Sequence, residues 1–180
     1  DYDNKIVERS IALSDVKEGF ITPSYPEEAT APLDEGELIK IPEGMGDIDV
    51  FEAWSLITDK SSPEYKLRVQ AGEDYDNEGF GKINGRYVVA VRPVYGTVGD
   101  YVTFTFADGS TIECIIGDVK GEDGDATNKW GHLDGRNILE FLVNKGDWYG
   151  YKDNPGTAKN HPEWGQCILE CRNLGNFWGR

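Results

Sequence analysis

Two acidic residues stand beside apolar segments, where a carboxyl group could do chemistry. Asp118 directly follows the apolar stretch 115–117, and Glu140 lies inside the apolar stretch 138–143. A carboxyl that is partly removed from water favours its protonated form, which suits a general acid. Asp118 and Glu140 could then supply the acid and the base or nucleophile that glycosidic bond cleavage uses. In the alternative interpretation, Asp118 is a turn residue that accepts hydrogen bonds from its own loop.

Aromatic residues in the loops and turns could contact a sugar, because flat rings offer large apolar contact areas. We predict six substrate-binding residues: Tyr95, Lys120, Trp130, His132, Trp148 and Tyr149. Packing within the protein is the alternative for several of these rings. Three loop acids are alternatives to Glu140 as the second carboxylate: Asp123, Asp125 and Asp134.

The chain has 180 residues and a formal net charge of −15, which limits its partners. A nucleic-acid partner is disfavoured because phosphate contacts need a basic surface, and an anionic membrane surface is disfavoured for the same reason. No apolar stretch approaches the roughly 20 residues of a membrane span. A neutral glycan, a cationic ligand and metal ions stay open as partners. The first residue is Asp rather than Met, so we expect a processed chain or an excised fragment.

The cysteines and histidines give little support to a metal or thiol chemistry. Cys114, Cys167 and Cys171 allow either one disulfide with one free thiol or three free thiols. Cys114 is the expected partner in any disulfide, because Cys167 and Cys171 are too far apart along an extended strand to bond each other. The chain has only two histidines, which argues against a zinc site. No local signature supports a Cys-His protease, and we expect no cofactor.

One acidic turn copies the first half of a calcium-binding loop. Asp74, Asp76 and Glu78 alternate and are followed by Gly79. A complete loop of about 12 residues would end on a glutamate, but Gly85 stands at that position. We therefore favour a turn without metal over a calcium site.

The chain divides at about residue 50. Residues 1–50 are rich in Glu, Asp and Pro and are predicted to form an extended acidic arm or linker, and residues 51–180 one domain. A hydroxyl cap just before Pro63 and a stop signal at Gly72 predict a short helix between Pro63 and Gly72. Apolar or alternating runs predict strands at 86–91, 101–106, 111–116, 137–143 and 166–172. Many short strands, with 22 glycines and 8 prolines, favour a mainly β fold and a small closed barrel.

Five segments, in order, resemble uncharacterised proteins of Gram-positive bacteria and their phages that look like double-psi β-barrel modules. These segments are 61–67, 84–91, 98–101, 112–120 and 139–143. The resemblance implies a six-stranded double-psi β-barrel with a short N-terminal helix, preceded by the acidic arm. This fold is shared by expansins, barwin-like proteins, family 45 endoglucanases and some peptidoglycan lytic transglycosylases.

In the catalytic members of that fold, an Asp at a strand end is the general acid on a glycosidic oxygen, and Asp118 matches it. The resemblance thus implies peptidoglycan cleavage by a glycoside hydrolase or lytic transglycosylase, located extracellularly in the cell wall or in a phage virion. In the lytic transglycosylases one carboxyl can act as acid and then as base, without a second carboxylate. Relatives carry a His-Thr-Asp-like stretch after this Asp, whereas residues 124–128 read Gly-Asp-Ala-Thr-Asn and His132 comes later.

The resemblance also leaves a function without catalysis open, because expansin-like members bind or loosen glycan without hydrolysing it. The alternative is a non-catalytic glycan-binding or structural module of a phage tail or a secreted wall protein. In that case the acidic arm, residues 1–50, is expected to dock a protein partner.

Overall fold

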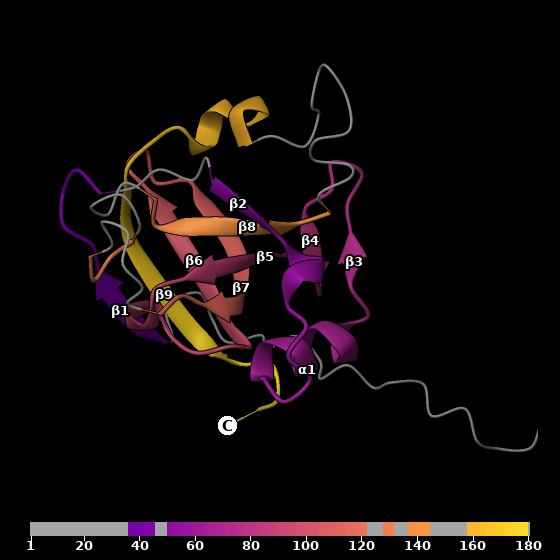
Figure 1. Ribbon diagram of the computed structural model, residues 1–180. Coiled ribbons are helices and arrows are strands. Elements are labelled where there is room, and N and C mark those ends of the chain that lie inside the picture. Colours follow the sequence, from indigo (N-terminus) through magenta and orange to yellow (C-terminus); the bar gives the residue numbers. More distant parts are fainter. Residues whose placement is uncertain (1–35, 46–49, 122–127, 132–136, 145–157, 180) are drawn as a thin grey trace, which may run out of the picture.

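The computed structural model describes residues 36–45, 50–121, 128–131, 137–144 and 158–179. Within these residues the protein is mainly β with one α-helix, which confirms the predicted fold class (Figure 1). The helix is α1 (Pro63–Ala71), and the short 3-10 helices are η2 (Trp54–Leu56), η3 (Pro93–Tyr95), η4 (Ala158–Asn160) and η5 (Pro162–Trp164). The strands are β1 (Glu37–Lys40), β2 (Val50–Ala53), β3 (Asp74–Tyr75), β4 (Gly81–Ile83), β5 (Arg86–Val91), β6 (Asp100–Phe106), β7 (Thr111–Val119), β8 (Leu139–Val143) and β9 (Ile168–Asn176).

The strands form one 9-stranded sheet with the order β1-β9-β6-β7-β5-β4-β3. Strand β8 pairs with β5, and β2 pairs with β8, so β5 has three partners. Two pairings are parallel, β5 with β7 and β2 with β8, and the others are antiparallel. Nine strands stand in place of the six expected, and the pairings among the described residues leave the sheet open. The extra strands are short: β3 and β4 extend the sheet beyond β5, and β1 extends it beyond β9.

Helix α1 forms where local signals predict it. The Ser62 hydroxyl accepts a hydrogen bond from the Tyr65 amide at 3.1 Å, and Pro63 occupies the first turn, where no amide donor is needed. The helix ends at Gly72, which has a φ of 85° that glycine adopts without strain. Its one buried side chain, Leu67, fixes the helix against the sheet.

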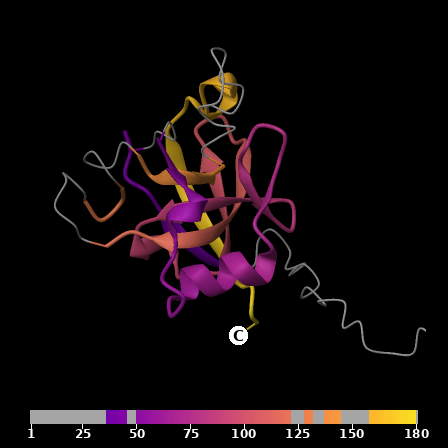
Figure 2. The same ribbon diagram turned by 45° about the vertical axis from the view of Figure 1, so that its right-hand side comes forward.

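Successive residues along a strand point alternately into two apolar clusters, as the pleat of a strand requires. Val89 and Val91 of β5 join the main cluster, whereas Val88 and Ala90 join a second cluster that includes Leu67 of α1. Helix α1 lies at one end of the β structure, and the η4–η5 segment lies at the opposite end, in both views (Figure 1, Figure 2). The sheet is therefore covered differently at its two ends, and the acidic residues lie on the side of the second cluster.

Strand β1 comes from the region predicted as an acidic arm. It pairs antiparallel with β9, with Leu38 opposite Arg172 and Lys40 opposite Glu170. The remaining described part of that region, residues 41–45, contacts the body through Ile41, whose amide donates to the Leu169 carbonyl. The boundary at residue 50 stays a prediction, and residues 1–35 lie outside the described residues.

Candidate functional site

Three strands bring the two predicted carboxylates together. Ala90 of β5 is in register with Asp118 of β7 on one side and with Glu140 of β8 on the other. Residues in register across a sheet point to the same face, so Asp118 and Glu140 flank the small Ala90 side chain. A fourth strand, β2, pairs with β8 beside Glu140 and adds Glu52 (Figure 1). The pair suggested by the sequence is thus part of a larger acidic group.

Lys120 contacts all three of these carboxylates. Its ammonium nitrogen lies 3.3 Å from Oδ2 of Asp118 and 3.4 Å from Oε2 of Glu140, and it donates a short hydrogen bond to Oε2 of Glu52. We call Glu52, Asp118, Lys120 and Glu140 the acidic tetrad. When its members are all ionised, three negative charges face one positive charge. The tetrad then has a surplus of negative charge that a proton or a cationic group of a ligand would reduce.

The tetrad is partly removed from water. The side chains of Glu52, Asp118, Lys120 and Glu140 are 25%, 19%, 21% and 11% exposed. Burial lowers the pKa of Lys120, but the hydrogen bond to Glu52 and the charges of Glu140, Glu52 and Asp118 outweigh it, so the net pKa is raised. Lys120 therefore keeps its positive charge throughout the neutral range. The site is therefore charged and only partly exposed.

Gly117 allows β7 to present Asp118 in this place. The pairing of β5 with β7 shifts register between Val89 and Ala90, so that Gly117 is the extra residue of a bulge. A Cβ on Gly117 would lie 2.3 Å from Cγ1 of Val88 and 2.8 Å from Cδ1 of Leu142. No larger residue fits between these neighbours without displacement. The bulge puts Asp118, rather than Gly117, opposite Ala90.

The backbone of Lys120 is also held in place, by Arg92. Nη1 of Arg92 donates to the carbonyl of Lys120 at 2.9 Å and to the carbonyl of Gly121 through a short hydrogen bond. The Lys120 amide donates to the Val91 carbonyl at 2.9 Å. Arg92 is itself buried. Both sides of the Lys120 peptide are therefore fixed, which restricts where its side chain can reach.

This geometry permits the two predicted carboxylates to act on one bond. Oxygens of Asp118 and Glu140 both lie within 3.4 Å of the same Lys120 nitrogen, so these oxygens are no further apart than twice that distance. Paired carboxyl groups of glycosidases are about 5–9.5 Å apart, depending on the stereochemistry of the reaction. The tetrad can therefore give and take a proton at neighbouring positions, with a fixed positive charge between them.

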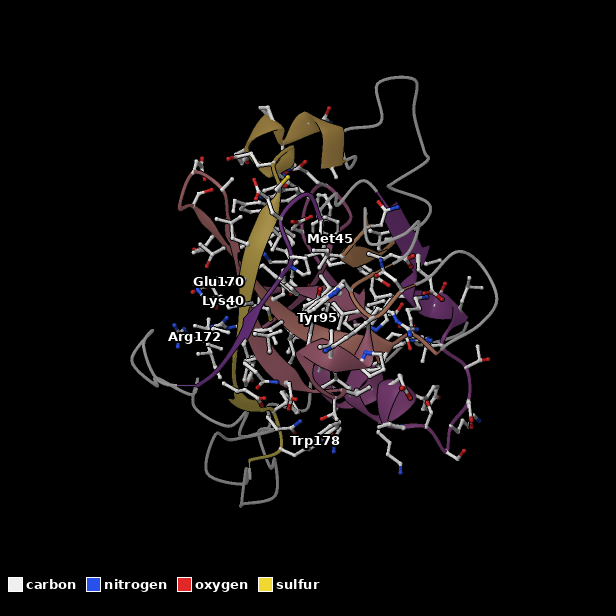
Figure 3. All side chains as sticks on the ribbon, turned by 90° about the vertical axis from the view of Figure 1, so that its left-hand side faces the viewer. Lys40, Met45, Tyr95, Glu170, Arg172 and Trp178 are labelled. Carbon is white, nitrogen blue, oxygen red and sulfur yellow. The ribbon has the colours of Figure 1, made fainter. Side chains whose placement is uncertain are left out.

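Tyr95 does not lie where a ligand could reach it. Its side chain is fully buried in the main cluster, edge-on to Phe104, and its hydroxyl donates to the Trp130 carbonyl at 2.8 Å (Figure 3). Burial raises the pKa of this hydroxyl. These are the contacts of a packing residue, which was the alternative for several of the predicted rings, and the substrate-contact role of Tyr95 stays a prediction. The short helix η3 turns the ring inward, which the Pro-Val-Tyr-Gly sequence alone did not indicate.

The other predicted contact residues are only partly described. Trp130 is half-buried, and the ammonium of Lys129 lies 4.8 Å from its ring centroid. His132, Trp148 and Tyr149 lie outside the described residues, as do the alternative acids Asp123, Asp125 and Asp134. Their predicted roles stay predictions. Lys120 is placed in the tetrad itself, where it would meet a bound ligand together with the carboxylates.

The residues of the calcium-like turn are engaged in protein contacts. Oδ1 of Asp76 accepts hydrogen bonds from the amides of Glu78 and Phe80, both at 3.0 Å, and Asp74 accepts one from the Tyr75 amide. Glu78 contacts His161. In the described part of the chain, no group of three or more His, Cys, Asp or Glu side chains is arranged to hold a metal ion. No described helix is long and apolar enough to cross a membrane.

The three cysteines are free thiols, which is one of the two arrangements that the sequence left open. Cys114 and Cys171 are fully buried in the main cluster, and burial raises the pKa of both thiols. A thiol of raised pKa is a poor nucleophile at neutral pH. The arrangement gives no support to thiol catalysis by these two residues.

Glu52 is the site residue that the sequence did not indicate. Its segment, Val50–Ala53, is too short to stand out as a strand, and it reaches the site only through the parallel pairing of β2 with β8. The apolar neighbours of Glu52, Phe51 and Ala53, were the available signal, but such a short pattern does not tell which distant strand becomes the partner. No known protein family, curated protein or solved structure matches this chain.

Proposed function

We propose that this protein cleaves a polysaccharide, with peptidoglycan as the substrate, and that the acidic tetrad is its reacting site. The observation that supports this most is the meeting of three half-buried carboxylates from three strands around one lysine. Partly buried charges of like sign cost folding stability, and such arrangements cluster at functional sites. The resemblance of Asp118 to the strand-end acid of glycan-cleaving barrels points to the same reaction.

In the proposed reaction, Asp118 gives a proton to the glycosidic oxygen as the bond to the anomeric carbon breaks. The carboxylate that forms is stabilised by Lys120, 3.3 Å away. Glu140, the least exposed member, provides negative charge for the developing oxocarbenium ion or takes the proton of an attacking hydroxyl. If a hydroxyl of the sugar attacks, Asp118 can itself take back the proton, as in a lytic transglycosylase.

The same proposal includes the fold, a double-psi β-barrel. Its support is the mixture of two parallel pairings, β5 with β7 and β2 with β8, in an otherwise antiparallel sheet of short strands. Similarity to the uncharacterised Gram-positive and phage proteins belongs to this proposal too. It predicts an extracellular location, in the cell wall or in a phage virion, and a protein partner for residues 1–50.

Muropeptide analysis tests the function. Purified peptidoglycan is incubated with the wild-type protein and with Asp118→Asn, and the soluble fragments are separated and identified by mass. We expect the wild type to release fragments and Asp118→Asn to release them at least about 100-fold more slowly. Loss of a general acid typically lowers the rate by a factor of about 10²–10⁴. Fragments with an anhydro end would identify internal attack, and reducing ends would identify hydrolysis.

Asp108→Asn is the matched control. Asp108 lies in the exposed hairpin turn between β6 and β7, where it accepts hydrogen bonds from Ser110. This variant makes the same chemical change outside the tetrad, so it should cleave as the wild type does. A wild-type protein that releases no fragment would reject the enzymatic proposal for peptidoglycan, and equal activity of Asp118→Asn would reject the role of Asp118.

A second candidate function is a non-catalytic glycan-binding or structural module. The observation in its favour is that Lys120 already pairs with each carboxylate of the tetrad, so ion pairing alone accounts for their meeting. Sedimentation with cell walls separates the candidates. Wall binding that persists in Asp118→Ala, together with no fragment release by the wild type, would support this module over the enzyme.

A further inference from the structure

His161 joins two segments that are far apart in the sequence. Its Nε2 atom lies 2.9 Å from Oε2 of Glu78, in the turn between β3 and β4, and its Nδ1 atom lies 3.1 Å from Oε1 of Glu163 in η5. The imidazole ring stacks on Trp164, with centroids 4.0 Å apart and planes at 15°, and meets Phe80 edge-on. We call Glu78, His161 and Glu163 the His161 bridge.

The bridge depends on the protonation state of the histidine. An ionised carboxylate only accepts hydrogen bonds, whereas a neutral imidazole has a single N–H and a lone pair on its other nitrogen. Only the imidazolium form can donate to Glu78 and Glu163 at once. Neutral His161 would leave a lone pair facing a carboxylate oxygen about 3 Å away, which is repulsive.

Among the described residues, the elements at the His161 bridge carry several charged or titratable groups. Asp76 and Glu78 belong to the β3–β4 turn, Glu163 to η5, and Lys82 and Tyr87 to β4 and β5. Burial and the charges of Asp76, Glu78, Cys114 and Glu163 raise the pKa of Tyr87 to about 12, so these carboxylates act on one region. The ammonium of Lys82 lies 3.4 Å from the Tyr87 ring centroid.

We propose that His161 is a proton-sensitive contact that controls how tightly the η4–η5 segment is held to the β3–β4 turn. In acid, the imidazolium makes two charge-assisted hydrogen bonds and the segment is tight. When the proton is lost, one carboxylate must turn away. Glu163 is the expected one, because its side chain is 53% exposed whereas that of Glu78 is 27% exposed. The remaining bond to Glu78 is then between a neutral donor and a charge, and is weaker.

The bridge lies over the aromatic end of the main cluster. Trp164 stacks on Phe141, with centroids 5.1 Å apart, and meets Phe80 and Tyr87 edge-on. This is the end opposite α1 (Figure 1). A looser η4–η5 segment therefore changes the cover of an aromatic surface and leaves α1 in place. The inference uses none of the tetrad residues and holds whether or not the proposed function does.

Tryptophan fluorescence of the full chain tests the inference. A protonated imidazole in contact with an indole quenches its emission, so the Trp164 signal, obtained by subtracting the spectrum of Trp164→Phe, should rise once between about pH 5 and 8. His161→Gln should lose this rise. His132→Gln changes the other histidine of the chain and should keep it.

Hydrogen exchange of the wild type gives a second test that needs no variant. The amides of Trp164 and Gly165 donate to the carbonyls of His161 and Pro162, and their protection should fall several-fold from acid to neutral pH after correction for intrinsic rates. Amides of α1 should not change. A Trp164 signal that stays flat with pH, a rise that survives in His161→Gln, or constant protection of both amides would overturn the inference.

Discussion

Asp100 and the acidic tetrad are two places where the fold takes carboxylates out of water, and they are satisfied in different ways. Asp100 is 1% exposed, and its two oxygens accept hydrogen bonds from the Thr97 amide, the Thr97 hydroxyl and the side-chain amides of Asn173 and Asn176. These donors are neutral and come from the loop before β6 and from β9. Asp100 thus ties two distant parts of the chain together.

In the tetrad, by contrast, several carboxylates share one charged donor. Three carboxylates, more exposed than Asp100, share the ammonium of Lys120. A carboxylate surrounded by fixed neutral donors holds its negative charge and gains nothing from a ligand. A group of like charges around one cation is sensitive to a proton, a substrate hydroxyl or a change of one member. Under the proposed function, this difference separates a carboxylate that stabilises the fold from carboxylates that react.

Removing the Asp100 carboxylate should have the largest effect on stability. Asp100→Ala removes one of the two acceptors of the Asn173 and Asn176 side-chain amides, which still donate to the Tyr95 and Val98 carbonyls, and it removes the acceptor of the Thr97 amide. We expect a loss of about 3 kcal/mol or more in the free energy of unfolding. Equilibrium denaturation in urea measures it. Asp108→Ala, in an exposed turn, should cost much less. If the two variants lost similar stability, the hydrogen bonds to Asp100 would not be what holds β6 to β9.

Gly117→Ala should have the next largest effect. The added methyl meets Cγ1 of Val88 and Cδ1 of Leu142, so β7 must move away from β5 and β8. Overpacking of this kind costs about 1–3 kcal/mol, and we expect a value near the upper end. Gly109→Ala is the control, because its added methyl meets no atom within 4 Å and costs only the strain of its φ of 85°, about 1 kcal/mol. Equal losses would show that the bulge is adaptable.

The parts of the fold that local chemistry decides could be predicted. Helix α1 follows from Ser62, Pro63 and Gly72, all within or beside the helix itself. The turn at Asp108 and Gly109 follows from that dipeptide, and β5, β6 and β7 follow from their apolar patterns. Each of these signals is complete within about ten residues. The pairing partners were not predictable in the same way.

The candidate site shows where such signals end. Asp118 and Glu140 were singled out by their apolar neighbours, and the structure places them on either side of Ala90. Glu52 and the central place of Lys120 depend on the parallel pairing of β2 with β8, which no local pattern encodes. The burial of Tyr95 was not predictable either, because its contact with Phe104 depends on a strand that follows it in the sequence. Long-range pairing is what the sequence leaves open.

Lys120→Met should have a moderate effect with a defined pH dependence. The pKa of Lys120 is raised in the folded protein, because its carboxylate partners outweigh burial. Its contribution to stability is therefore complete below its unfolded pKa of about 10.4 and is lost only as pH rises through the higher folded value. We expect Lys120→Met to lose about 1–2 kcal/mol at neutral pH, because three carboxylates then face one another.

The pH series separates charge from packing in that variant. The loss should stay constant from neutral pH to about pH 10, and it should shrink at higher pH as the wild-type lysine loses its charge. Urea denaturation at each pH measures the difference. A loss that did not change at high pH would mean that Lys120 acts through its aliphatic chain rather than its charge, and the contrast with Asp100 would disappear.

Glu52→Gln should have the smallest effect, since it removes one ion pair and one surplus negative charge together. We expect a loss of about 0.5 kcal/mol or less in the free energy of unfolding, because half-exposed pairs contribute little and the remaining carboxylates still hold Lys120. Glu170→Gln is the comparison. Its partner Lys40 is 72% exposed and lies beside it on the surface of β1 and β9 (Figure 3), so no change in stability should be measurable.

A large loss in Glu52→Gln would mean that the tetrad is a tightly coupled structural network like that of Asp100. A gain would instead mean that repulsion among its carboxylates exceeds their attraction to Lys120, which is the state expected of a site that awaits a proton or a ligand.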